Sequence, residues 1–298
     1  MVKLLRNSRF MEHVAVIGTG KMGSAFVKRF LDVGYKVTAW NRTIEKAMHL
    51  QKDGAEVVRE INEIETAETY ILSLTDATAV ENVTDEIIKS NVSNKLIIDT
   101  STLLPEDTKR IANKLKEKGL RFVDCPVGGT VAPALNGKLL GMLGGSKQDA
   151  SRAMPILQQI CRRVEHMGEV GSGSHMKLAI NLPLAIYWKT LAEAMTMVRE
   201  SGIEIAQAIS VIADSSGGPT VLKNREDIVI KTLSGDDQIS TVSIEVLFKD
   251  LQLAIAQSQK TNSPMTISAA ALDAYADAIT NNLGKFDGST LTRFLVDE

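Results

Sequence analysis

HVAVIGTGKMG, residues 13–23, decides how the first half of this chain folds. A short apolar run leads into Gly18, Gly20 and Gly23 in GxGxxG spacing, and a helical pattern starts within the motif. In this context one glycine makes a tight turn, the next lets the backbone approach a pyrophosphate, and the third allows the helix to pack closely on the strand. The stretch therefore predicts a dinucleotide-binding turn with these cofactor-binding residues: Gly18, Thr19, Gly20, Lys21, Met22 and Gly23.

The same rhythm continues through the first half of the chain. Short apolar runs (YKVTAW, ETYILSL, NKLIIDT and LRFVD) alternate with amphipathic stretches such as PEDTKRIANKLKEKG. Such runs are typical of parallel strands covered by helices on both faces. Past Gly173 the segments are long and rich in Ala, Leu and Met, without strand-like alternation. We therefore expect an α/β fold: a Rossmann-type doubly wound parallel sheet in residues 12–173, then an all-α domain in residues 174–298.

The end of the second predicted strand indicates which dinucleotide is bound. NAD-binding proteins usually place an Asp or Glu there, which hydrogen-bonds the ribose 2′-hydroxyl. This chain has Asn41, Arg42 and Thr43 instead, and its first carboxylate is Glu45. The Arg42 guanidinium suits a 2′-phosphate, and the Asn41 amide and the Thr43 hydroxyl add further hydrogen-bonding groups. NADP is therefore favoured over NAD, and the alternative is that Arg42 is a solvated surface residue.

Composition argues against several classes of protein. With 34 Lys and Arg against 36 Asp and Glu, the chain has no basic excess for nucleic acid or an anionic membrane. No apolar run is long enough to span a bilayer, and residues 1–10 do not form a secretory signal. The two cysteines lack CxxC spacing and the four histidines lack HExxH spacing, so we expect no disulfide and no metal site. A cytoplasmic protein with a small-molecule substrate fits best.

Further segments place polar residues at turns and on a helix. Leu74-Thr75-Asp76 and Ser101-Thr102-Leu103-Leu104-Pro105 each follow an apolar run, and the glycine-rich stretch DCPVGGTVAPALNGKLLGMLGG spans residues 124–145. Lys177 and Asn181 follow Gly171-Ser172-Gly173 and share a helix face because they lie four residues apart. Phe248-Lys249-Asp250-Leu251 lies in a later helical segment. Taken alone, such serines and threonines are usually helix caps, and such lysines are usually solvated.

Together these motifs resemble the β-hydroxyacid dehydrogenase family, over nearly the whole chain from Val14 to Leu295. Members include 3-hydroxyisobutyrate dehydrogenase and semialdehyde reductases; 6-phosphogluconate dehydrogenase is a longer relative, and imine reductases are a divergent branch. The resemblance implies that Lys177 is the catalytic acid or base and that Asn181 positions the substrate. It also implies cofactor contacts from Leu74, Thr75, Thr102 and Lys249, and substrate contacts from Ser101, Gly128, Gly129, Thr130, Lys177 and Asn181.

Two departures from the family pattern bear on the substrate. The family has a serine and two glycines where this chain has Gly128, Gly129 and Thr130, so the hydroxyl that helps to hold a substrate carboxylate is missing at position 128. Backbone N–H groups of the glycines, or a displaced hydroxyl on Thr130, are the alternatives. Pro183 lies two residues beyond Asn181, where a proline removes one helical hydrogen bond and is expected to kink the helix.

We therefore expect an NADP-dependent dehydrogenase or reductase that acts on CH–OH groups, with hydride transfer to or from a small aldehyde, ketone or β-hydroxy acid in a cleft between the domains. Reduction is the favoured direction. One rival is an imine reductase, but that branch usually lacks the lysine; another is a dinucleotide-binding module without catalysis. The family also implies a homodimer or higher homo-oligomer formed by the helical domain, and the apolar stretch TLAEAMTMVRESG (190–202) suits an interface or a core equally.

Overall fold

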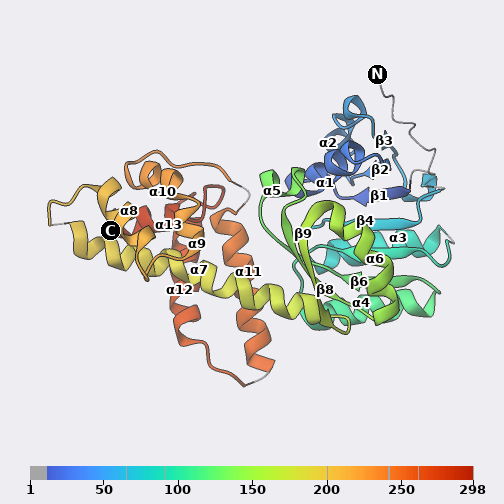
Figure 1. The fold of residues 1–298 in the computed structure, drawn as a ribbon. Coiled ribbons are helices and arrows are strands. Elements are labelled where there is room, and N and C mark those ends of the chain that lie inside the picture. The colour runs from blue at the N-terminus through green and yellow to red at the C-terminus, as the bar shows by residue number, and fades with distance from the viewer. Residues whose placement is uncertain are drawn as a thin grey trace. The chain divides into compact units, whose positions relative to one another are not determined.

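The computed structural model describes residues 12–64, 66–90, 92–199, 201–240, 242–260 and 262–297. The chain divides into two compact units, Met1–Lys177 (unit 1) and Leu178–Glu298 (unit 2). In Figure 1 unit 1 holds the strands, in blue to green, and unit 2 consists of helices, in yellow to red. This arrangement confirms the predicted fold class, a Rossmann-like sheet followed by an all-helical region.

Unit 1 is built on a sheet whose first six strands are parallel. They lie in the order β3-β2-β1-β4-β5-β6, the order of a doubly wound dinucleotide-binding sheet. The five apolar runs found in the sequence form five of these strands, and the short β3 is the sixth. The bounds are β1 (His13–Ile17), β2 (Lys36–Trp40), β3 (Glu56–Val57), β4 (Thr69–Leu72), β5 (Leu96–Asp99) and β6 (Arg121–Asp124).

Beyond β6 the sheet becomes mixed, which the sequence pattern did not indicate. The strand β8 (Leu139–Gly144) runs antiparallel to β6 and to β7 (Val127–Gly128), and β9 (Cys161–Gly168) runs parallel to β8. β7 and β8 lie within the glycine-rich stretch 124–145, which contains the predicted substrate-binding residues Gly128, Gly129 and Thr130. Cys125 and Cys161 are buried and are free thiols in this structure.

Helices cover both faces of the sheet, because successive residues of each buried strand point to opposite sides. Val14 and Val16 pack in one apolar cluster with α1 and α6, whereas Ala15 and Ile17 pack in a second cluster with α3 and α4. The helical segments of unit 1 are α1 (Lys21–Asp32), α2 (Glu45–Met48), η1 (Gln51–Asp53), η2 (Ile61–Glu63), α3 (Ala77–Lys89), α4 (Pro105–Glu117), α5 (Val131–Leu135) and α6 (Lys147–Ile160).

Local sequence explains where several of these helices begin. The Asp76 carboxylate accepts a hydrogen bond of 2.9 Å from the Ala79 N–H and so caps α3. Pro105 is the first residue of α4, where its missing N–H costs no helical hydrogen bond. The Ser146 hydroxyl caps α6 by accepting from the Asp149 N–H at 3.1 Å. These caps fix the turns that connect the strands to the helices.

Unit 2 is a set of packed helices, entered through α7, which begins in unit 1 and stays helical through Pro183. Its core includes the fully buried Trp188 and Tyr275. In the apolar stretch 190–202, Met195 is buried but Met197 is 79% exposed, so this stretch is only partly core. The helices are α7 (Ser172–Arg199), α8 (Ile205–Asp214), α9 (Thr220–Lys223), α10 (Glu226–Leu233), α11 (Ile244–Lys260), α12 (Thr266–Thr280) and α13 (Thr290–Asp297).

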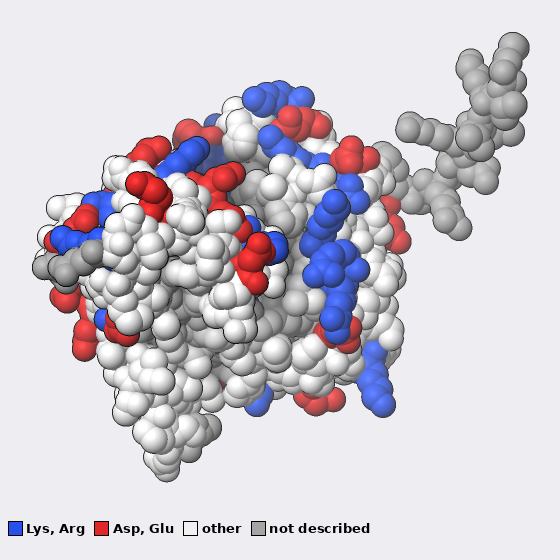
Figure 2. Space-filling model, turned by 60° about the vertical axis from the view of Figure 1, so that its left-hand side comes forward, with Lys and Arg blue, Asp and Glu red and all other residues white. Residues whose placement is uncertain are grey.

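The surface carries charges of both signs. On the face drawn in Figure 2, basic and acidic side chains are interspersed in many places, and the longest run of one sign is a vertical strip of blue side chains toward the right. None of the helices in the described ranges is both long enough and apolar enough to cross a membrane.

Candidate active site

Five connections of unit 1 start at one edge of the sheet. The strands β1, β2, β4, β5 and β6 are parallel, so their carboxyl ends meet at the same edge, which we call the carboxyl edge. Ligands of doubly wound sheets bind outside this edge. The cofactor- and substrate-binding residues predicted between Gly18 and Thr130 all lie in the segments that follow these strand ends, within six residues of them.

The glycine motif has the backbone geometry that the sequence predicted for each glycine. Gly18 has a φ of +95°, which favours glycine, and a Cβ there would collide with the backbone oxygen of Ser73. A Cβ on Gly23 would collide with the backbone oxygen of Gly18, so α1 lies directly against the turn. At Gly20, by contrast, no described heavy atom beyond its own chain neighbours lies within 4 Å of the Cβ position. The backbone is therefore open at Gly20, where a pyrophosphate could approach the start of α1.

Asn41 joins the end of β2 to the glycine motif. Its Oδ1 accepts from the Thr19 N–H at 3.0 Å, and its Nδ2 donates to the Thr43 carbonyl at 2.9 Å. Both ends of the amide are thus used within the protein, and the Thr19 hydroxyl donates to the Lys46 carbonyl at 3.1 Å. Asn41 therefore shapes the turn around the predicted cofactor position, and its second N–H and second lone pair remain for the predicted cofactor contact.

Arg42 differs from its neighbour Asn41. Its side chain is exposed, and within the ranges that the structure describes its guanidinium makes no ion pair. Glu45, the first carboxylate after the strand, is exposed as well. Arg42 is consequently available to an anionic ligand at this turn, as a 2′-phosphate requires.

Ser101 ties the loop after β5 to the loop after β4. Its hydroxyl accepts from the Leu74 N–H at 3.1 Å, and its own N–H donates to the Asp99 Oδ1 at 2.9 Å. Ser101 is only 5% exposed, whereas Thr102 is half-buried and Thr75 is exposed. The structure therefore gives Ser101 a bracing role between two loops, in addition to the substrate contact implied by the family.

Asp99 and Asp124 are neighbouring buried carboxylates at the ends of β5 and β6. Burial raises the pKa of Asp99 to about 6, hydrogen bonds from Ser101 act against this, and the nearby Asp124 charge adds to it. Burial likewise raises the pKa of Asp124, against hydrogen bonds from Gly171 and Ser174. Across the described residues no group of three or more His, Cys, Asp or Glu side chains is arranged to hold a metal ion.

Lys177 reaches the segment that follows β6. Its Nζ donates to the Val127 carbonyl at 2.9 Å, immediately before Gly128. Gly128 is half-buried, and a Cβ there would make an ordinary contact of 3.7 Å with Leu140. Gly129 has a φ of +125°, and a Cβ there would lie 2.7 Å from a Leu139 methyl carbon. A side chain would fit at position 128 but not at 129.

In unit 2 the predicted residues Asn181 and Lys249 meet through a third residue. Asn181 Nδ2 donates to Asp250 Oδ2 at 2.6 Å, and Lys249 Nζ lies 3.3 Å from Asp250 Oδ1. Asn181 is 7% exposed and Asp250 is 4% exposed. Asp250 belongs to the motif Phe248-Lys249-Asp250-Leu251, but it was not among the predicted site residues. The sequence offered one indication that Asp250 belongs to the site, which is its position next to Lys249, a predicted cofactor-binding residue.

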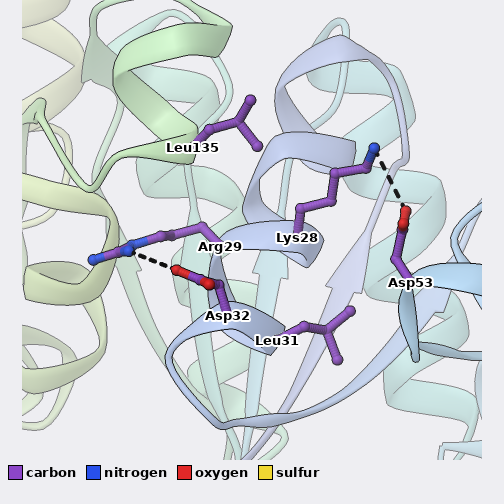
Figure 3. Close-up of a pocket in the computed structure, with 6 residues that line it drawn as sticks. All are labelled: Lys28, Arg29, Leu31, Asp32, Asp53 and Leu135. Carbon is purple, nitrogen blue, oxygen red and sulfur yellow. Dashed lines mark hydrogen bonds and ion pairs between the residues drawn. The ribbon is translucent and has the colours of Figure 1, made fainter.

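A hollow of about 520 Å³ lies elsewhere on unit 1, beside the last turns of α1. As Figure 3 shows, its charged side chains pair with each other: Lys28 points toward Asp53 and Arg29 toward Asp32. The Nζ of Lys28 is 3.5 Å from Asp53, and the guanidinium of Arg29 is 3.2 Å from Asp32. The glycine motif is at the opposite end of α1, so this hollow is not part of the candidate site.

Two family models together cover almost the whole described chain. Residues 13–168 match the NAD-binding domain of 6-phosphogluconate dehydrogenase. Residues 171–295 match the model described as the NAD-binding domain of NADP-dependent 3-hydroxyisobutyrate dehydrogenase. The two matches meet near the start of α7, just before Lys177.

Individual relatives in sequence and in structure belong to the same group of enzymes or share its fold. Glyoxylate/succinic semialdehyde reductase 1 of Arabidopsis thaliana is 28% identical over 282 residues, which is 93% of this chain and 96% of the relative. Among solved structures, Mycobacterium tuberculosis 3-hydroxyisobutyrate dehydrogenase superposes with a TM-score of 0.86 at 23% identity, covering 96% and 99% of the two chains. An imine reductase from Pseudomonas sp. gives a TM-score of 0.64 at 21% identity, covering 97% and 100%. The fold is thus shared with both solved structures, and it is more similar to the 3-hydroxyisobutyrate dehydrogenase than to the imine reductase.

Proposed function

This chain belongs to the β-hydroxyacid dehydrogenase family, and from that premise we propose that it transfers hydride between NADP(H) and a small aldehyde, ketone or β-hydroxy acid. Membership makes it an NAD(P)-binding oxidoreductase of the 3-hydroxyisobutyrate dehydrogenase type. The preference for NADP, the role of Lys177 and the class of substrate are the proposal. The observation that supports it most directly is the hydrogen bond from Lys177 Nζ to the Val127 carbonyl.

The dinucleotide fits the carboxyl edge. The open backbone at Gly20 leaves room for the pyrophosphate, and the close packing of Gly18 and Gly23 brings the start of α1 to it. Asn41 holds this turn in shape, so Arg42 is the residue that would contact a 2′-phosphate. The absence of a carboxylate between Trp40 and Glu45 removes the usual partner of an unphosphorylated ribose. Both features favour NADP.

Lys177 would supply the proton. The cofactor, when bound, provides or takes up the hydride. In the direction of reduction, negative charge develops on the substrate oxygen, and Lys177 gives it a proton: the O–H bond forms as an N–H bond of Nζ breaks. The Val127 carbonyl accepts one N–H of the ammonium and thereby keeps Nζ beside Gly128 and Gly129. In the direction of oxidation the neutral amine takes the proton back.

Asn181 and Lys249 would act together in unit 2. Because the Nδ2 of Asn181 is bound to the Asp250 carboxylate, its Oδ1 is the atom left to accept a hydrogen bond from a substrate hydroxyl. The ion pair with Asp250 restricts the position of the Lys249 ammonium, for which the family resemblance suggests a contact with the cofactor. Gly128 leaves space where relatives have a serine, so we propose a substrate that fills this space or binds without that hydroxyl.

The decisive experiment measures the oxidation of NADPH and NADH with a panel of semialdehydes, keto acids and cyclic imines. Lys177→Ala should lower kcat by about 100-fold or more, since positioned proton transfer contributes roughly that much. The matched control is Lys189→Ala. Lys189 lies on the same helix as Lys177, and its ion-pair partner is the exposed Glu193. The control should keep the parent kcat, and both variants should bind NADPH as the parent does.

Several outcomes would overturn the proposal. Equal turnover by Lys177→Ala and the parent would remove the lysine from the mechanism. A preference for NADH would contradict the argument from Arg42, and turnover of cyclic imines alone would favour the imine reductase alternative. Dinucleotide binding without turnover of any compound would favour a module without catalysis.

A further inference from the structure

Asp124, the last residue of β6, is bonded to the start of α7. Its Oδ1 accepts from the Gly171 N–H at 2.7 Å, and its Oδ2 accepts from the Ser174 N–H at 2.8 Å and from the Ser174 hydroxyl at 3.2 Å. The residue is 1% exposed, so these donors replace water around the charge. A carboxylate at a helix N-terminus is favourable because unpaired N–H groups converge there.

The backbone lies close to this carboxylate at two glycines, Gly144 and Gly173. A Cβ on Gly144 would collide with Asp124 Oδ1. A Cβ on Gly173 would lie 2.9 Å from Asp124 Oδ2 and would also collide with the Met142 carbonyl oxygen. The Ser174 hydroxyl is held from its other side by Thr108 at 2.9 Å. The first turn of α7 is therefore packed against the ends of β6 and β8 with little freedom to slide or rotate.

The segment 124–127 contacts α7 at two points. The Asp124 side chain binds the helix start, and the Val127 carbonyl accepts from Lys177 Nζ at 2.9 Å. Ser174 and Lys177 are three residues apart, so about 4.5 Å of helix separates the two points. Because the two points lie within one turn of the helix, a shift of the helix start would move the Lys177 ammonium away from Val127 by about the length of that shift.

We propose that Asp124 is a positioning residue, which fixes the start of α7 so that the Lys177 ammonium stays beside Gly128 and Gly129. The inference rests on the proposed function, in which Lys177 supplies the proton. Two carboxylate oxygens accept three donors here, and charge-assisted bonds of this kind are stronger than neutral ones. An asparagine has one accepting oxygen, and its NH₂ group would face a backbone N–H that needs an acceptor.

The test compares Asp124→Asn with Asp149→Asn in the full-length chain. Asp149 is a matched control because it is a buried carboxylate in unit 1 that binds Ser146 at the start of a different helix, α6. For Asp124→Asn we expect kcat to fall at least tenfold, with the NADPH dissociation constant within threefold of the parent and an altered pH profile of kcat. Asp149→Asn should change none of these three quantities.

A second readout does not depend on activity. Amide hydrogen exchange at residues 171–177 should accelerate at least tenfold in Asp124→Asn and stay at the parent rate in Asp149→Asn. If Lys177→Ala keeps full turnover, the proposed mechanism fails while the exchange data still decide whether Asp124 holds the helix start. Two results would overturn the positioning role of Asp124. One is an unchanged exchange rate in Asp124→Asn, and the other is an unchanged kcat in Asp124→Asn although exchange is accelerated.

If Asp124→Asn does not fold, Ser174→Ala is the second variant, because it removes only one donor to the carboxylate. Ser174→Ala should lower kcat by about threefold to tenfold, and an unchanged kcat would again contradict the proposal.

Discussion

The carboxyl edge of unit 1 and the contact between α7 and α11 in unit 2 hold their residues by different means. At the carboxyl edge, close backbone packing at Gly18 and Gly23 shapes the turn, and most polar contacts there involve backbone groups. In unit 2, one buried carboxylate, Asp250, joins the side chains of Asn181 and Lys249. The first arrangement depends on the absence of side chains, and the second depends on a specific charge.

The two kinds of site should tolerate substitution to different degrees. A backbone contact cannot relax without moving a strand or a helix, so an added methyl group is costly. A side-chain network can lose one member and keep the fold, although the partners left behind need new hydrogen bonds. Substitutions at the carboxyl edge and in unit 2 should therefore differ in how much stability they cost.

Gly23→Ala should cause the largest loss. The new Cβ would collide with the Gly18 carbonyl oxygen, which belongs to the backbone and cannot rotate away. We expect the free energy of unfolding to fall by about 3 kcal/mol or more, at the upper end of the cost of overpacking. Urea unfolding measures this loss.

The matched variant is Gly20→Ala, at an open position. Its free energy of unfolding should lie within about 1 kcal/mol of the parent value, and it should bind NADPH at least tenfold more weakly. Equal stability of the two variants would contradict the packing argument.

The sequence predicted the glycine turn well because its determinants are local. GxGxxG spacing, an apolar strand before it and a helical pattern after it lie within one short stretch, and the backbone geometry follows from them. The strands β7 and β8 were missed because Gly128, Gly141 and Gly144 interrupt the apolar alternation that marks a strand. The strand β9 was missed because its sequence, CRRVEHMG, is mostly charged or polar. Asp250 was missed as a functional residue for another reason. Its partner Asn181 is 69 positions away, and such a pairing leaves no periodic signal.

Asp99 tests whether charge matters at the carboxyl edge too. Its pKa is raised to about 6 from 3.8, so between these pH values the unfolded chain has lost a proton that the folded chain keeps. Stability contributed by this group is therefore highest at acid pH and decreases as the pH rises from about 4 to 6, by about 3 kcal/mol in total. Asp99→Asn removes this titration, so its stability relative to the parent should improve by most of that amount between pH 4 and pH 7. Urea unfolding of both proteins at pH 4 and pH 7 measures this change in relative stability. If the stabilities of the two proteins change in parallel with pH, the pKa of Asp99 is not raised in the folded protein.

Asp250→Ala should have a moderate effect on stability and a clear effect on catalysis. It leaves the buried Nδ2 of Asn181 without an acceptor, which costs about 2 kcal/mol. Asp250→Asn offers an oxygen to the same Nδ2 and should recover about half of this loss, because a neutral acceptor is roughly half as strong as a charged one. Thermal unfolding and kcat should rank the parent, Asp250→Asn and Asp250→Ala in that order. The reverse order of the two variants would show that the network in unit 2 tolerates loss of the acceptor.

Arg42→Ala should give the smallest effect, because Arg42 is an exposed charge at an edge otherwise shaped by backbone packing. We expect KM for NADPH to rise about tenfold, equivalent to about 1.4 kcal/mol, with KM for NADH unchanged. The loss should shrink as salt is raised from 0.01 M to 1 M, since an exposed charge is screened over roughly 30 Å in the first case and roughly 3 Å in the second. Lys52→Ala, which removes another exposed cation of unit 1, is the control and should alter neither KM. An equal rise in KM for both cofactors would mean that Arg42 contacts the dinucleotide somewhere other than the 2′-phosphate, and the carboxyl edge would then discriminate between the two cofactors by another residue.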